Sequence, residues 1–167
     1  EAARNRDFLR HGVSRNLLDY AMRLLARRAY SSEELRRRLS RRSDDPAEIQ
    51  AVLNRLTDLQ LLDDRSFSQQ RAIRRRTVDF WGQRRIQLEL RQLGLDARMI
   101  RLALHQAEQE LPESEALARA VERWLRLHGE PSRLRALKRL YEYCLRLGYP
   151  AETVREKLAP WFRDVAE

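Results

Sequence analysis

Residues 91–97 read RQLGLDA, and a related pattern returns without a gap at residues 145–151 as LRLGYPA. In each copy a leucine precedes the glycine, an apolar residue follows it, and the next residue is one that often begins a helix. Glycine at this place is typical of the left-handed turn just past a helix end. The two stretches therefore predict a helix, a short turn and a second helix, and they indicate a repeated unit.

The repeat extends to apolar positions on both sides of the turn. Ile100 and Leu104 match Val154 and Leu158. The first part of the chain aligns on the second at an offset of 51 residues, with the matched pairs Leu35/Ile86, Leu39/Leu90, Ile49/Ile100 and Leu53/Leu104. A repeat of about 50 residues holds three helices and is too small to bury its own core well, so neighbouring copies must stack.

The fold class expected from this pattern is all-α, with three tandem three-helix repeats in an elongated, curved array of either hand. Helix start signals support it: Ser14 is a candidate N-cap, residues 31–34 read as a capping box, and Asp45 precedes Pro46. The first helix is expected over about 14–29, and a helix opened by Asp63-Asp64 is expected to reach about Phe80. The expected divisions are an N-terminal extension at 1–13 and repeats at 14–62, 63–111 and 113–164.

The composition limits the class of protein. Five Gly and five Pro in 167 residues are too few for a turn-rich β protein and favour helices. No apolar run approaches the length needed to span a bilayer, so no membrane contact is expected. The single cysteine, Cys144, excludes an internal disulfide and fits a reducing compartment, so a cytoplasmic location is expected.

The net charge of +9 is unevenly distributed along the chain. Residues 14–43 carry a net +6 and residues 65–101 carry +7, whereas residues 44–64 carry −5 and residues 105–167 are neutral. Thirty-two of the basic residues are Arg and two are Lys, a ratio that codon bias alone could produce. The position of the excess charge still predicts an attraction to nucleic acid or to an acidic protein surface. The alternative is an ordinary solvated helix face.

The candidate binding residues come from these two basic stretches. Arg71, Arg74 and Arg75 share one helix face, and Arg84 and Arg91 lie seven residues apart on another. Tyr30 and Trp81 could stack on bases or anchor an interface, with helix-junction packing as the alternative. The full set of candidate basic residues is Arg27, Arg28, Arg36, Arg37, Arg41, Arg71, Arg74, Arg75, Arg76, Arg84, Arg85 and Arg91.

No catalytic constellation is found in the sequence. His11, His105 and His128 lack metal-ligand or triad spacing, and there is no glycine-rich phosphate loop. Cys144 falls on an apolar helix stripe, where a buried thiol is expected. The pair Asp63-Asp64 is interpreted as a helix cap and not as a metal site. We therefore expect no enzyme activity, no metal and no cofactor.

The order and spacing of several segments resemble the RecX family of bacterial regulatory proteins. The matching stretches are residues 28–39, RAYSSEELRRRL; residues 62–67, LDDRSF; residues 82–95, from GQRRI to LGL; and residues 145–149, LRLGY. The resemblance covers about residues 15–163. Two departures lie at helix junctions: Gln60-Leu61 replace the usual glycine and aromatic residue, and Gln83 replaces a frequent proline.

The resemblance implies a fold of three tandem three-helix units and a role in modulating RecA. It implies binding to the RecA–DNA filament and inhibition of recombinase, ATPase and coprotease activity in recombinational repair and the SOS response. The expected partners are RecA filaments and single-stranded DNA, with non-specific double-stranded DNA left open, and a monomer is expected. Filament capping, groove insertion and monomer sequestration all stay open.

Two other classes of function compete with this interpretation. Three-helix units with arginine-rich helices permit a helix-turn-helix protein that binds duplex DNA, although no helix shows a clear base-reading set. A scaffold that binds only protein is the other alternative, and its effect on a filament would not depend on salt.

Overall fold

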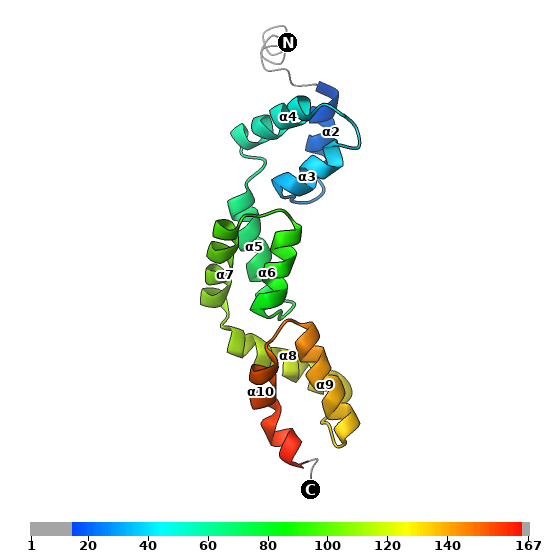
Figure 1. The fold of residues 1–167 in the computed structure, drawn as a ribbon, viewed down its shortest axis with the longest axis vertical. Helices are drawn as coiled ribbons and strands as arrows, with labels where there is room; N and C mark the ends of the chain where they lie inside the picture. The colour runs from blue at the N-terminus through cyan, green and yellow to red at the C-terminus, as the bar shows by residue number, and fades with distance from the viewer. Residues whose placement is uncertain (1–14, 165–167) are drawn as a thin grey trace. The chain divides into compact units, whose positions relative to one another are not determined.

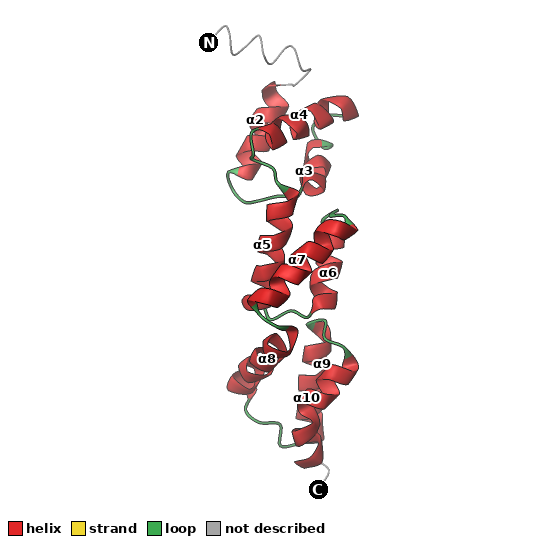
Figure 2. Ribbon diagram, turned by 90° about the vertical axis from the view of Figure 1, so that its left-hand side faces the viewer, coloured by secondary structure: helices red, strands yellow, loops and turns green. Residues whose placement is uncertain are grey.

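The computed structural model describes residues 15–164, and these residues form nine α-helices and no strand (Figures 1 and 2). The expected extension at 1–13, the candidate cap Ser14 and His11 lie outside the described residues. The all-α expectation is confirmed. The helices are α2 (Arg15–Leu25), α3 (Ser32–Leu39), α4 (Pro46–Asp58), α5 (Asp64–Thr77), α6 (Gln83–Gln92), α7 (Ala97–Glu110), α8 (Glu113–His128), α9 (Leu134–Arg146) and α10 (Ala151–Asp164).

Four of the described helices, α3, α4, α5 and α7, begin directly after a residue whose side chain caps them. Ser31 Oγ accepts a hydrogen bond from the Glu34 amide at 3.1 Å, and the Glu34 carboxylate accepts one from the Ser31 amide, which completes the expected capping box. Asp45 Oδ1 accepts from the Ala47 amide at 2.8 Å, and Pro46 is the first residue of α4. These local contacts satisfy backbone donors that have no partner within the helix.

Two helices end earlier than their periodicity predicts. Helix α2 ends at Leu25, after which the Arg27 and Arg28 amides both turn back to the Leu24 carbonyl. Helix α5 ends at Thr77 and not at about Phe80, because Phe80 has a φ of +53°. The Trp81 amide then donates to the Arg75 carbonyl oxygen at 3.0 Å and closes the turn.

The repeat predicted from the sequence is reproduced in the buried positions. Each matched apolar residue is buried, and the third repeat supplies the corresponding residue at every position. The equivalent sets are Leu35/Ile86/Leu140, Leu39/Leu90/Cys144, Ile49/Ile100/Val154 and Leu53/Leu104/Leu158. Cys144 therefore occupies a core position that the other two repeats fill with leucine.

The described residues divide into two compact units, which are considered separately. The first contains residues 15–68 and 92–99, and the second contains residues 69–91 and 100–164. The core of the first unit is formed by α2, α3 and α4, with Leu17, Ala21, Leu35, Val52 and Leu56 among its buried residues. A buried cluster in the second unit joins α8, α9 and α10, with Trp124, Leu137, Leu140, Val154 and Leu158 at its centre.

In each compact unit, hydrogen bonds connect the start of one helix to the next repeat. In the first unit Ser31 Oγ donates to the Leu93 carbonyl at 2.6 Å, and the Ser32 amide donates to Asp64 Oδ1 at 2.7 Å. In the second unit the matching positions form matching contacts, with the Gly82 amide donating to the Leu147 carbonyl at 2.8 Å and the Gln83 amide to Glu113 Oε1 at 2.6 Å. In both units, the first amide of a helix is therefore capped by the first residue of the helix that opens the next repeat. Asp64 of α5 caps α3, and Glu113 of α8 caps α6.

Candidate nucleic-acid or filament interface

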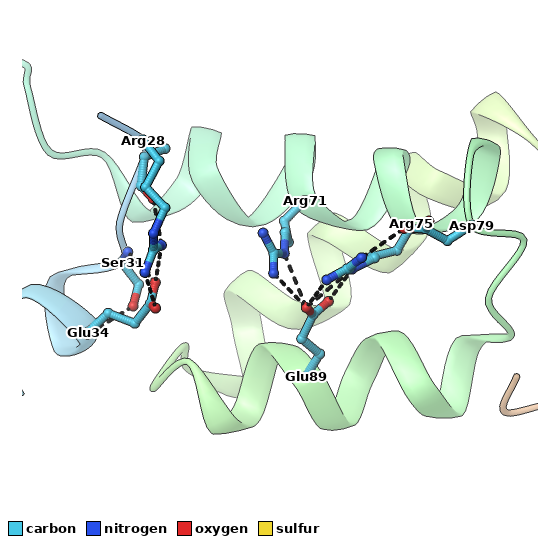
Figure 3. A network of polar contacts seen from close by, with 8 residues as sticks. Arg28, Ser31, Glu34, Arg71, Arg75, Asp79 and Glu89 are labelled. Carbon is cyan, nitrogen blue, oxygen red and sulfur yellow. Dashed lines mark hydrogen bonds and ion pairs between the residues drawn. The ribbon is translucent and has the colours of Figure 1, made fainter. Parts of the chain in front are cut away.

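The basic residues fall into two groups, according to whether an acidic side chain of the same chain engages them. Arg28 belongs to the first group, since its guanidinium donates to both oxygens of Glu34 at 3.0 and 3.3 Å (Figure 3). The hydrogen bond with Glu34 raises the pKa of Arg28. The same guanidinium lies 3.6 Å from the centre of the Tyr30 ring. Tyr30 is only 7% exposed, so its ring has little surface left for a partner.

The arginines of α3 also have internal partners. Glu33 forms ion pairs with Arg37 at 3.0 Å and with Arg36 at 3.5 Å. Arg36 donates to Gln50 Oε1 at 2.7 Å, and Arg37 donates to the Gln92 carbonyl at 3.2 Å. Both arginines are at least partly exposed, so these contacts reduce their positive field without removing it.

Helices α5 and α6 are joined by two arginines that converge on one carboxylate (Figure 3). Arg71 and Arg75 donate to Glu89 at distances down to 2.7 and 2.6 Å, and Arg75 also donates to Asp79 at 2.8 Å. Burial of Glu89 opposes its ionisation, but hydrogen bonds from Arg75 and Arg71 outweigh this and lower its pKa. The hydrogen bond with Glu89 in turn raises the pKa of Arg75. These two arginines therefore connect the helices as well as carrying charge.

The Trp81 ring is covered by two guanidinium groups. The Arg75 guanidinium carbon lies 4.2 Å from a ring centroid of Trp81, and that of Arg85 lies 3.8 Å away. Arg85 also donates to the Arg146 carbonyl at 2.9 Å. A base that stacks on Trp81 would compete with these cation–π contacts for the part of the indole that they cover.

Arg76 is one of the candidate binding residues, but the structure buries its side chain. Its side chain is 0% exposed, and it forms an ion pair with Glu108 at 3.3 Å. Its Nε and Nη2 atoms are buried and have no hydrogen-bond partner within the described residues. Arg76 stands one residue after Arg75 and so points from α5 in a different direction, into the core. It cannot reach a ligand in this structure.

Five of the candidate arginines are exposed and have no ion pair within residues 15–164. These residues are Arg27, Arg41, Arg74, Arg84 and Arg91. Arg74 lies on α5, while Arg84 and Arg91 lie two turns apart on α6 with Leu88 between them, 56% exposed. Guanidinium groups without an internal acid are available for phosphate or carboxylate ligands.

The described residues contain no arrangement that suggests catalysis. Cys144 is buried, and burial raises its pKa to about 12, so the thiol is not a nucleophile at neutral pH. His128 stacks on Trp124 at 4.4 Å between ring centroids. Asp63 and Asp64 accept from the amides of Ser66 and Ser32, as caps do. Over the part of the chain that the structure describes, no group of acids, histidines or cysteines could hold a metal ion.

Internal partners of the arginines are the main feature that sequence reasoning missed. Glu33 could have been found, because Glu33 and Arg37 have the four-residue spacing of a helical ion pair. Glu89 had no such local signal, since it meets Arg71 and Arg75 only when α5 and α6 pack together.

Among the described helices, none is long and apolar enough to cross a membrane.

The fold and the exposed arginines define a class of protein, a tandem three-helix repeat protein with a partly basic surface. The family model for the first three-helix domain of RecX matches residues 18–56. The regulatory protein RecX of Chromobacterium violaceum is 34% identical over 140 residues, which are 83% of this chain and 86% of that protein. The regulatory protein RecX of Halorhodospira halophila is 36% identical over 147 residues, 88% of this chain and 89% of that protein. The chain belongs to the RecX family of regulatory proteins.

The fold is also similar to that of a solved relative. The crystal structure of RecX from Lactobacillus salivarius superposes with a TM-score of 0.69 at 18% sequence identity. The match covers 86% of this chain and 95% of that one. At this level of identity the likeness shows the shared helical fold alone.

Proposed function

We propose that this protein binds the RecA–DNA filament and inhibits the recombinase, ATPase and coprotease activities of RecA during recombinational repair and the SOS response. Membership of the RecX family supports this proposal, as does the presence of exposed basic residues on a helical repeat. The protein acts by binding, as a monomer in the cytoplasm, and not by catalysis. It requires no metal and no cofactor.

The observation that carries the proposal is the set of exposed arginines without an acidic partner in the middle repeat. Arg74, Arg84 and Arg91 come from α5 and α6, and no ion pair neutralises them within the described residues. A RecA–DNA filament offers phosphates and carboxylates, and guanidinium groups bind both in a planar, bidentate geometry. Arg27 and Arg41 in the first repeat are also exposed and have no ion pair within the described residues. The ion-paired candidates would first have to exchange an internal carboxylate for the ligand.

A second candidate function is that of a helix-turn-helix protein that binds duplex DNA. One observation favours it: α6 and α7 are separated by the four residues 93–96, and Gly94 has a φ of +80°. Short turns containing glycine join the helices of such DNA-binding units. Preferential binding to one duplex sequence over a scrambled one in a mobility-shift assay would favour this candidate over filament regulation.

The proposal is tested by measuring the ATPase rate of RecA on single-stranded DNA with and without this protein across a series of salt concentrations. The expected result is inhibition at low salt that weakens as the salt concentration rises, since counterion release drives contacts with phosphate. A RecA rate that stays unchanged at the lowest salt would overturn the proposal. Inhibition that is independent of salt would favour a purely protein-binding scaffold.

A further inference from the structure

Helix α7 presents a basic face that the charge analysis of the sequence did not single out. Its buried side is formed by Ile100, Ala103, Leu104 and Ala107. The opposite side carries Arg98, Arg101 and His105, all exposed, together with Leu102, which is 42% exposed. Spacings of three and four residues place these side chains on one face of the helix. The three basic residues span about 10 Å along the helix axis.

No acidic side chain engages the two arginines of this face. Neither Arg98 nor Arg101 has a side-chain hydrogen bond or ion pair within the described residues. Their nearest acid further along the helix, Glu108, is already occupied, because it accepts from Arg76 at 3.3 Å and from the Glu113 amide at 3.1 Å. His105 Nε2 lies 3.2 Å from Gln109 Nε2, so the partner of His105 is a neutral amide and not an acid.

The other two repeats show that this face is not required by the fold. In the first repeat the equivalent face of α4 is neutral, and there Gln50 donates to Asn54 at 2.7 Å. In the third repeat the equivalent face of α10 carries two acids and one arginine. The matched residues are Ala47, Gln50, Ala51 and Asn54 in α4, and Glu152, Arg155, Glu156 and Ala159 in α10. At these matched positions the face of the third helix is neutral in the first repeat, cationic in the second and net acidic in the third, so the cationic face is a property of the middle repeat.

We propose that Arg98, Arg101 and His105 on α7 bind the phosphodiester backbone of a nucleic acid strand. This deepens the proposed function, on which it rests, by assigning to one helix the contact with the DNA of the filament. Helix α7 follows the short turn after α6, and in helix-turn-helix units the helix in this place lies against DNA. The guanidinium groups of Arg98 and Arg101, which have no internal acid, match the bidentate geometry of phosphate groups, and the place of α7 after the turn assigns the face to nucleic acid.

The test is the salt dependence of binding to labelled oligothymidylate, without RecA, for the full chain and for the double variant Arg98→Ala/Arg101→Ala. Loss of two phosphate contacts should weaken binding and reduce the slope of log K against log salt concentration by about 1.4 on a single strand. On a duplex of the same length the reduction should be about 1.8. The form of nucleic acid, single-stranded or duplex, on which the slope falls by the full expected amount is the form that α7 contacts.

The matched control is Arg155→Ala/Lys157→Ala in α10, which removes the same charge from exposed positions of the third repeat. The control should keep the wild-type slope. Equal slopes for wild type and the α7 variant would overturn the proposal, and so would equal losses in the α7 variant and the control. If the α7 variant binds DNA normally but fails to inhibit RecA, the face binds protein and the proposal is wrong. Because the assay lacks RecA, it gives its result whether or not wild type inhibits RecA, so the two proposals can fail separately.

Discussion

The amide of Gly82 donates a 2.8 Å hydrogen bond to the carbonyl oxygen of Leu147, which brings the start of α6 against the turn that follows α9. A Cβ atom on residue 82 would lie 2.7 Å from both the carbonyl carbon and the oxygen of Gly148. Backbone atoms cannot move aside as a side chain can, so the close approach depends on the absence of a side chain at this position.

The substitution Gly82→Ala should therefore lower the free energy of unfolding by about 1–3 kcal/mol, the usual cost of overpacking. Chemical denaturation followed by circular dichroism measures this. Gln83→Ala is the control, because the exposed Gln83 side chain has no such contact and should change stability by less than about 0.5 kcal/mol. A Gly82→Ala protein as stable as the control would contradict the role assigned to this contact.

Gln60 occupies a left-handed conformation with a φ of +56°, which glycine adopts more readily than other residues. This conformation costs a non-glycine residue about 1–2 kcal/mol. A glycine would avoid that cost, but it loses more conformational entropy on folding, which offsets a part of the gain. Gln60→Gly should raise the free energy of unfolding by roughly 0.5–1 kcal/mol. Glu122→Gly, at an exposed position inside α8, should lower it by about 1 kcal/mol. Destabilisation by both substitutions would show that Gln60 is not strained.

Arg76 is a buried cation with two unpaired nitrogen atoms, whereas its partner Glu108 is 47% exposed and remains hydrated. Replacement by methionine removes the buried charge and keeps most of the volume. Arg76→Met should leave the free energy of unfolding unchanged or raise it by up to about 2 kcal/mol, with inhibition of RecA retained. Arg76→Glu should lower the free energy of unfolding by about 3 kcal/mol or more, because it buries a carboxylate beside Glu108. Equal losses in the two variants would contradict this account.

Glu89 accepts hydrogen bonds from Arg71 and Arg75, so Glu89→Gln should lower the free energy of unfolding at neutral pH by about 1–3 kcal/mol. The pKa of Glu89 is lowered in the folded protein, so the unfolded chain takes up the proton first as the pH falls. The difference between wild type and Glu89→Gln should be complete above roughly pH 5 and shrink as the pH falls through the unfolded and then the folded pKa.

Denaturation curves from about pH 7 to pH 3 measure this dependence. Glu142→Gln is the matched control, since Glu142 is exposed and has no ion pair in the described part of the chain. Glu142→Gln should not lower the free energy of unfolding at neutral pH, and its difference from wild type should not depend on pH. A difference for Glu89→Gln that stays constant down to the lowest pH would contradict the assignment.

The parts of the fold that sequence reasoning predicted correctly depend on neighbouring residues. The Ser31–Glu34 capping box, the glycine turn at Gly94 and the apolar stripe through Ile100 and Leu104 each act within a few residues. Internal repetition then extended these local signals over the chain. Phe80 was predicted incorrectly as helical, because apolar spacing continues through it although its backbone has turned left-handed.

The candidate site was less predictable, because the direction and partner of each arginine depend on packing between helices. Arg75 and Arg76 are neighbours in the sequence, yet one pairs with Glu89 near the surface and the other is fully buried. Charge density along the chain cannot separate these outcomes. Arg101 aligns with Arg155 of the third repeat, and only a comparison of the faces of α4, α7 and α10 distinguishes the surroundings of the two arginines.

The most direct test of the central claim is the ATPase rate of RecA on single-stranded DNA at low salt, with the triple variant Arg74→Glu/Arg84→Glu/Arg91→Glu in place of wild type. Its control is Arg126→Glu/Arg133→Glu/Arg135→Glu, which changes the net charge equally at exposed positions of the third repeat. We expect wild type and control to inhibit RecA, whereas the Arg74/Arg84/Arg91 variant, folded by circular dichroism, should not. Inhibition by this variant at the wild-type level would show that these three arginines are not needed for the regulation of RecA.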